Sequence, residues 1–206
     1  MISRTVQAPA TPSRAWAGLA ALLGLLAIFG WGAPREAIDW QPALALTQPW
    51  RAFSAVGVHY SLLHLVANLA GVATVGVLGV AARVPSSAAW AWAIAWPLTQ
   101  LGLLIEPALA HYGGLSGVLH AGVAVVAVVL LWRPSAPTRR LVGLALLGGL
   151  VVKVLAEAPW GAPLRHPAGS DIAVAPLAHA SGALAGLLCA FVARLVTNPS
   201  EGHRSA

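Results

Sequence analysis

The chain has 206 residues, of which 58% are hydrophobic and only 9% are charged, and its mean hydropathy is +0.77. A soluble domain usually carries about a quarter charged residues, so this chain has too little polar surface to cover itself in water. The composition excludes an ordinary soluble domain and predicts a single helical bundle whose solvent is the lipid bilayer.

The net charge is +6, but the basic residues stand singly between apolar stretches and form no basic stripe with interleaved aromatic residues. We therefore interpret the charge as a signal of membrane topology and expect no nucleic-acid partner. The one cysteine, Cys189, can form neither an intrachain disulfide nor a zinc knuckle.

Apolar stretches long enough, or nearly so, to cross a hydrocarbon core of about 30 Å follow one another along the chain. We expect an all-α polytopic membrane protein with six membrane-spanning helices, at residues 15–32, 60–81, 87–105, 115–132, 140–158 and 173–196. They form one membrane domain, 15–196, between polar tails at 1–14 and 197–206.

The arginines predict the orientation of these helices. If the N-terminus is cytoplasmic, eight arginines fall in cytoplasmic segments (Arg4, Arg14, Arg83, Arg133, Arg139, Arg140, Arg194 and Arg204) and three in outer segments (Arg35, Arg51 and Arg165). The positive-inside rule then places both termini in the cytoplasm, which agrees with an even number of spans.

Polar side chains inside membrane spans are costly and need a reason. His64 and Asn68 are four residues apart in the second expected span, so they share a helix face. Ser116 begins the fourth span, and His179 lies about two turns into the sixth. At 1.5 Å per residue, all four lie within roughly 10 Å of the outer boundary. Three helices are thus predicted to bring these groups to one depth.

The residue types suggest nucleophilic catalysis. A serine hydroxyl is a weak nucleophile unless a base removes its proton, and the imidazole of His179 can be that base. No acidic residue is evident at this depth, so the sequence predicts a Ser116–His179 dyad. Small residues flank both members and allow close helix packing; they are Gly114, Gly117, Gly182 and Gly186.

An oxyanion that develops on an attacked carbonyl needs hydrogen-bond donors. Free backbone N–H groups occur at any helix N-terminus, so the Ser116 amide is one candidate. Gly113 allows irregular backbone beside it, and the side chains of His64 and Asn68 can supply further donors.

With these motifs the sequence resembles the rhomboid family of intramembrane serine proteases. The motifs are Gly114-Leu115-Ser116-Gly117, His64-Leu65-Val66-Ala67-Asn68, and His179 with Gly182 and Gly186 after it; the Trp50-Arg51 pair matches the family's first outer loop.

The resemblance implies a six-helix rhomboid-like bundle in the bacterial inner membrane, with the active site opening toward the periplasm. It implies that Ser116 and His179 form a dyad that works through an acyl-enzyme, and that His64, Asn68 and the Ser116 amide line the oxyanion site. The expected partners are transmembrane protein substrates and the lipid bilayer. We expect no cofactor and no metal.

One position departs from the common family pattern. Many rhomboids have a tyrosine one turn after the serine, stacked on the catalytic histidine, whereas this chain has His120. This version is similar to the rhombosortase subfamily, which implies substrates with C-terminal sorting tails of the GlyGly-CTERM type. The sequence leaves open whether His120 only packs or also tunes His179.

We expect the other polar residues to have structural roles. Lys153 and Glu157 are expected to form an intrahelical ion pair near the outer face. Arg51 is expected to anchor the outer loop through backbone carbonyls. Of the remaining histidines, we expect His59 at the membrane interface, and His111 and His166 in solvated loops.

Two other functions are compatible with parts of the pattern. A rhomboid-like pseudoprotease would bind transmembrane segments without cleavage, but both members of the dyad are present. A zinc site or transporter could use His64, His120 and His179. No carboxylate is evident beside these imidazoles, and a serine flanked by glycines would then be unexplained.

Overall fold

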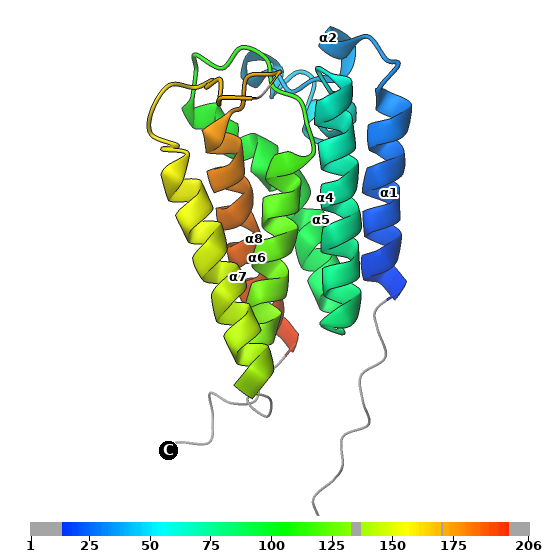
Figure 1. The fold of residues 1–206 in the computed structure, drawn as a ribbon. Helices are drawn as coiled ribbons and strands as arrows, with labels where there is room; N and C mark the ends of the chain where they lie inside the picture. The colour runs from blue at the N-terminus through cyan, green and yellow to red at the C-terminus, as the bar shows by residue number, and fades with distance from the viewer. Residues whose placement is uncertain (1–13, 133–136, 170, 198–206) are drawn as a thin grey trace, which may run out of the picture.

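The computed structural model describes residues 14–132, 137–169 and 171–197. The predicted tails therefore lie almost wholly outside the described residues, as does Arg133. Within the described chain, long helices run side by side in a bundle (Figure 1). They are α1 (Arg14–Gly30), α4 (Leu62–Ala81), α5 (Ser86–Leu101), α6 (Ser116–Leu131), α7 (Pro137–Ala156) and α8 (Pro176–Thr197).

Each predicted apolar stretch coincides with one long helix to within a few residues. Among the described residues, α4, α8 and α5 with its 3₁₀ extension η3 (Gly102–Ile105) are long and apolar enough to cross a membrane. Helices α1 and α6 are shorter apolar helices, and α7 carries three cationic residues, Arg139, Arg140 and Lys153. The apolar helices indicate a multi-pass membrane protein.

Buried indole rings connect neighbouring helices. The Nε1 of Trp16 in α1 donates to the carbonyl of Val75 in α4 at 3.1 Å, and the Nε1 of Trp92 in α5 donates to the carbonyl of Val118 in α6 at 2.8 Å. The two rings lie 4.5 Å apart between their centroids. A buried indole N–H needs a partner, so these bonds fix how the helices face one another.

Helix α8 lies against α6 with almost no side chain between the two backbones. A Cβ atom at Gly182 would collide with the carbonyl oxygen of Gly117, and one at Gly186 would lie 2.7 Å from the Cα of Ala121. A Cβ at Gly117 would lie 2.7 Å from the carbonyl oxygen of Ala178. The predicted role of these glycines in close helix packing is confirmed.

The chain between α1 and α4 folds over the end of the bundle where α6 begins (Figure 1). It contains only short helices: α2 (Arg35–Ile38), η1 (Pro42–Leu44), α3 (Arg51–Ser54) and η2 (Ala55–Gly57). The buried Arg51 holds it together, because its Nη1 donates to the carbonyls of Glu36 and Asp39, each at 2.9 Å. The predicted anchoring of the loop by Arg51 is confirmed.

Asp39 extends this anchor to the loop before α6. Its carboxylate pairs with Arg51 at 3.0 Å and with the Nδ1 of His111 at 2.7 Å. The next residue, Trp40, exchanges two backbone hydrogen bonds with Tyr112, at 2.7 and 2.8 Å. His111 is exposed as predicted for a solvated loop, but its ring is also held by Asp39.

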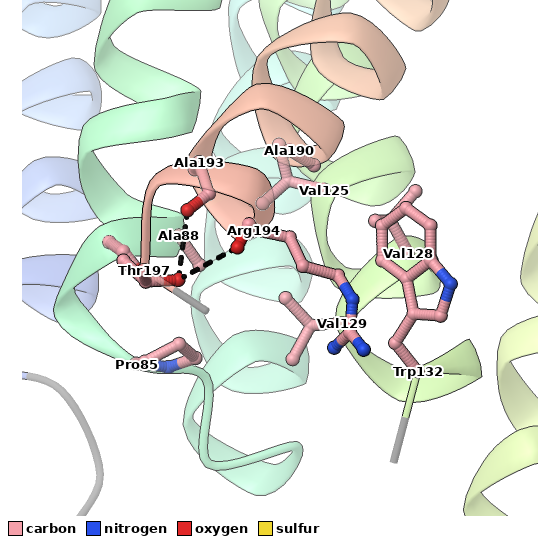
Figure 2. Close-up of a pocket in the computed structure, with 11 residues that line it drawn as sticks. Pro85, Ala88, Val125, Val128, Val129, Trp132, Ala190, Ala193, Arg194 and Thr197 are labelled. Carbon is pink, nitrogen blue, oxygen red and sulfur yellow. Dashed lines mark hydrogen bonds between the residues drawn. The ribbon is translucent and has the colours of Figure 1, made fainter. Parts of the chain in front are cut away.

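The opposite end of the bundle contains a separate cavity of about 150 Å³ between α5, α6 and α8 (Figure 2). Val125, Val128 and Ala190 are among its apolar lining residues. Arg194 and Trp132 also line this cavity. The guanidinium of Arg194 lies over the Trp132 ring, 4.9 Å from its centroid, in a cation–π contact. Because it adjoins the last turns of α6, this cavity is remote from Ser116.

We predict that Arg51→Met lowers the free energy of unfolding by about 3 kcal/mol, because it leaves the buried Asp39 carboxylate unpaired. Unfolding of the purified protein in detergent measures this change. Arg140→Met, at an exposed arginine of α7, is the matched control and should change stability by less than about 0.5 kcal/mol. Equal effects of the two substitutions would contradict the anchoring role.

Candidate active site

Ser116 and His179 meet at the end of the bundle where α6 and α8 begin. Ser116 is the first residue of α6, and His179 lies one turn inside α8. The Nε2 atom of the buried His179 is 2.9 Å from the Oγ of the partly exposed Ser116. This distance suits a hydrogen bond in which the hydroxyl donates to a neutral imidazole.

A carboxylate lies on the other side of the same imidazole. The Oε2 atom of Glu157 is 2.6 Å from the Nδ1 of His179. The expectation that no acidic residue lies at this depth was wrong. Glu157 follows the last residue of α7, and α7 ends at the side of the bundle where α6 and α8 begin, so its side chain reaches His179.

The predicted pairing of Lys153 with Glu157 is confirmed. The Nζ of Lys153 is 2.5 Å from the Oε1 of Glu157, at the predicted spacing of four residues. The antiparallel order of the spans could have revealed His179 as the second partner of Glu157, because the end of the fifth span must lie level with the start of the sixth. Spacing along one helix could not show a contact between helices.

The ring of His120 lies flat against that of His179. Its ring stacks on His179 with centroids 4.2 Å apart and planes 9° apart, and its Nδ1 is 2.7 Å from the carbonyl oxygen of Ser116. His120 thus packs as an aromatic ring and also bonds to the backbone of Ser116.

The side chain of Asn68 supplies an unused donor. Its Nδ2 is buried, and it makes no hydrogen bond within the described residues. Buried polar groups are nearly always paired, so this amide, on the helix face shared with His64, is an exception that leaves a donor available.

His64 is fixed by the start of α4. The hydroxyl of Ser61 caps this helix by accepting from the His64 amide at 3.0 Å. The Nδ1 of His64 accepts from the Tyr60 amide at 3.4 Å, and the Nε2 edge of its ring faces Gly114. A Cβ at Gly114 would lie 3.0 Å from that edge.

The glycines before Ser116 meet local requirements. Gly114 has a φ of +133°, which a residue with a side chain rarely adopts, and its amide donates to the carbonyl of Ala55 at 2.9 Å. A Cβ at Gly113 would collide with the side chain of Val58. The chain entering α6 is therefore shaped by backbone freedom and tight packing.

Tyr112 is a site residue that the sequence did not single out. Burial raises the pKa of its hydroxyl to about 12, although the side chain of Ser116 and the amide of Gly117 act to lower it. The hydroxyl therefore stays protonated close to Ser116, yet it makes no hydrogen bond of ordinary geometry within the described residues. It is a second unused donor beside Ser116.

Three further predicted positions are His59, Trp50 and His166. His59, which was expected at the membrane interface, is buried with 1% of its surface exposed. Its ring lies 4.8 Å from that of His64, and burial lowers its pKa. Trp50 is largely exposed beside α3, and His166 is an exposed loop residue, as predicted. Within the described residues, no three side chains of His, Cys, Asp or Glu converge as metal ligands.

The fold and this cluster define a helical multi-pass membrane protein with a histidine-bonded serine at one end of its bundle. Residues 46–195 match the rhomboid domain family. The match covers well over half of the chain, which therefore belongs to the rhomboid family, a membership that suggests an intramembrane serine protease. No curated protein matches the sequence.

We predict that Gly182→Ala separates α8 from α6 and destabilises the protein by about 1–3 kcal/mol, the usual cost of overpacking. Thermal unfolding in detergent measures this. Gly148→Ala in α7, where a Cβ would have no neighbour within 4 Å, is the control and should be neutral or stabilising. A neutral Gly182→Ala variant would mean that the helices can separate without cost.

We predict that His120→Tyr keeps partial activity, because a tyrosine ring can stack on His179 in the same place. The lost hydrogen bond to the Ser116 carbonyl is worth about 1 kcal/mol, so the catalytic rate should fall by no more than about tenfold. Steady-state cleavage rates measure it. Complete inactivity of a folded variant would instead give His120 a chemical role.

Proposed function

We propose that this protein is an intramembrane serine endopeptidase that cleaves transmembrane substrates through an acyl-enzyme on Ser116. The observation that carries the proposal is the 2.9 Å contact between the Ser116 Oγ and the His179 Nε2. It pairs a nucleophile with a base inside a family whose members include such proteases.

The proposed reaction has two halves. The Ser116 Oγ attacks the scissile carbonyl, its proton passes to the His179 Nε2, and that proton then goes to the leaving amine. Water then attacks the ester carbonyl as His179 takes its proton, and that proton passes from the Nε2 to the Ser116 Oγ as the acid product leaves. An amine acceptor could resolve the same ester in place of water, so transfer is chemically open as well as hydrolysis.

The orphaned amide of Asn68 supports its assignment as an oxyanion donor. His64 and the Ser116 amide complete the proposed site, and Gly113 contributes backbone freedom next to it. Removal of one such donor lowers the catalytic rate of well-studied serine proteases by about 10²–10³-fold. Asn68→Ala should therefore impair the chemical step more than substrate binding.

We further propose six membrane spans with both termini in the cytoplasm of a bacterial cell and Ser116 open to the periplasm. The arginine distribution supports this orientation. Ala110, exposed in the loop before α6, provides the test. A cysteine placed there in a Cys189→Ala background should react with an impermeant thiol reagent from the periplasmic side. Reaction from the cytoplasmic side alone would overturn the topology.

His120 supports a narrower assignment to the rhombosortase subfamily. Its substrates would be surface proteins that end in a GlyGly-CTERM-type sorting tail, with a glycine-rich motif, one transmembrane helix and a basic end. Cleavage would release the protein from that tail.

Co-reconstitution in liposomes tests the proposed function. A reporter that carries such a tail should be cleaved by the wild-type protein, and Ser116→Ala or His179→Ala should reduce the rate by at least about 10³-fold. A reporter with an unrelated transmembrane helix is the substrate control. Stable capture of the reporter by the wild type without cleavage would favour a pseudoprotease that binds transmembrane segments.

A further inference from the structure

The Glu157 carboxylate uses its two oxygens differently. Its Oε2 faces the Nδ1 of His179 at 2.6 Å, whereas its Oε1 faces the Nζ of Lys153 at 2.5 Å. The Nη1 of Arg165 donates to the backbone carbonyl of Glu157 at 2.6 Å, so the main chain is held independently of the carboxylate. The carboxylate is thus held from two sides, by Lys153 of α7 and by His179 of α8, while the following loop holds the main chain of Glu157.

This arrangement selects one tautomer of His179. A carboxylate can only accept a hydrogen bond, so the Nδ1 of His179 must carry its proton. The Nε2 then keeps a lone pair, which faces the Ser116 Oγ at 2.9 Å. With no acceptor at Nδ1, the imidazole could place its proton on either nitrogen, and the form protonated at Nε2 cannot act as a base toward Ser116.

The same contact matters when charge develops. As the Nε2 accepts the serine proton, the imidazole becomes a cation 2.6 Å from a carboxylate. Charge-assisted hydrogen bonds of this kind are about twice as strong as neutral ones. The ion pair with Lys153 keeps the carboxylate ionised and oriented, while the stacked His120 ring leaves His179 little freedom to rotate.

We propose that Glu157 is the positioning residue of His179 and completes a Glu157–His179–Ser116 triad, with Lys153 holding the carboxylate in place. This assignment rests on the proposed function. Glu157 stays ionised throughout: the proton moves between the Ser116 Oγ and the His179 Nε2, and the Nδ1 proton remains on the ring. The catalytic group at the nucleophile would thus be a triad and not the dyad that the sequence predicted.

A cavity beside the carboxylate makes a chemical-rescue experiment possible. It has a volume of about 430 Å³ and is lined by Glu157 together with Arg165, His166 and Pro176. The Glu157 side chain is itself 25% exposed. Removal of this side chain would therefore leave an accessible space in which formate or acetate can accept the hydrogen bond from His179.

The test is the rate at which a fluorophosphonate probe inactivates the purified full-length protein, which needs no knowledge of the natural substrate. Glu157→Gln and Glu157→Ala should slow inactivation by about 10²–10⁴-fold, as substitutions of the acidic member do in known triads. Formate should accelerate the inactivation of the Glu157→Ala variant by at least about tenfold. It should leave the inactivation rates of the Glu157→Gln variant and of the wild type unchanged. Glu36→Gln, at an exposed glutamate on the same end of the bundle, is the control and should react at the wild-type rate.

The outcomes separate the two proposals. Wild-type reactivity of a folded Glu157→Gln variant would overturn the triad and leave a Ser116–His179 dyad. The triad would also be overturned if the Glu157→Ala variant reacts slowly only because it has unfolded, and formate does not restore its reaction rate. A wild-type protein that does not react at all would contradict the proposed function, and the triad with it.

Discussion

The close contact of the α6 and α8 backbones at three glycines is the constraint on which the site depends. Gly117, Gly182 and Gly186 let the two backbones touch, and any Cβ at these positions would meet backbone atoms of the facing helix. Only at that separation can a short serine side chain at the start of α6 reach an imidazole on α8. The spacing of small residues therefore sets the distance between Ser116 and His179, because small residues let membrane helices pack closely.

A second network stabilises the chain that leads into α6. Arg51 and Asp39 are both buried, and their pairing fixes the connection between α1 and α4. Asp39 and Trp40 then hold His111 and Tyr112, and Ala55 accepts from the amide of Gly114. Ser116 is thus positioned from two directions, by the glycine contacts of α6 with α8 and by a hydrogen-bonded loop from the first third of the chain.

Much of the fold could be predicted from the sequence, because the length of the apolar stretches and the charged residues between them locate membrane helices well. The stretches expected at 60–81 and 115–132 are α4 and α6, and the depth argument correctly joined Ser116 to His179. Glu157 was missed because its spacing to Lys153 gave it a sufficient partner within its own helix, while its second partner lies across the bundle. The burial of His59 and Tyr112 depends on how a Pro-rich loop folds back, which local patterns do not determine.

The most direct test is to locate the bond that a fluorophosphonate probe forms. Peptide mass mapping of the labelled wild-type protein should place the adduct on Ser116, and the same analysis of a folded His179→Ala variant should find none. That result would show a serine activated by the histidine 2.9 Å away. An adduct on another residue, or equal labelling of Ser116 without His179, would contradict the account of this site as a histidine-activated serine.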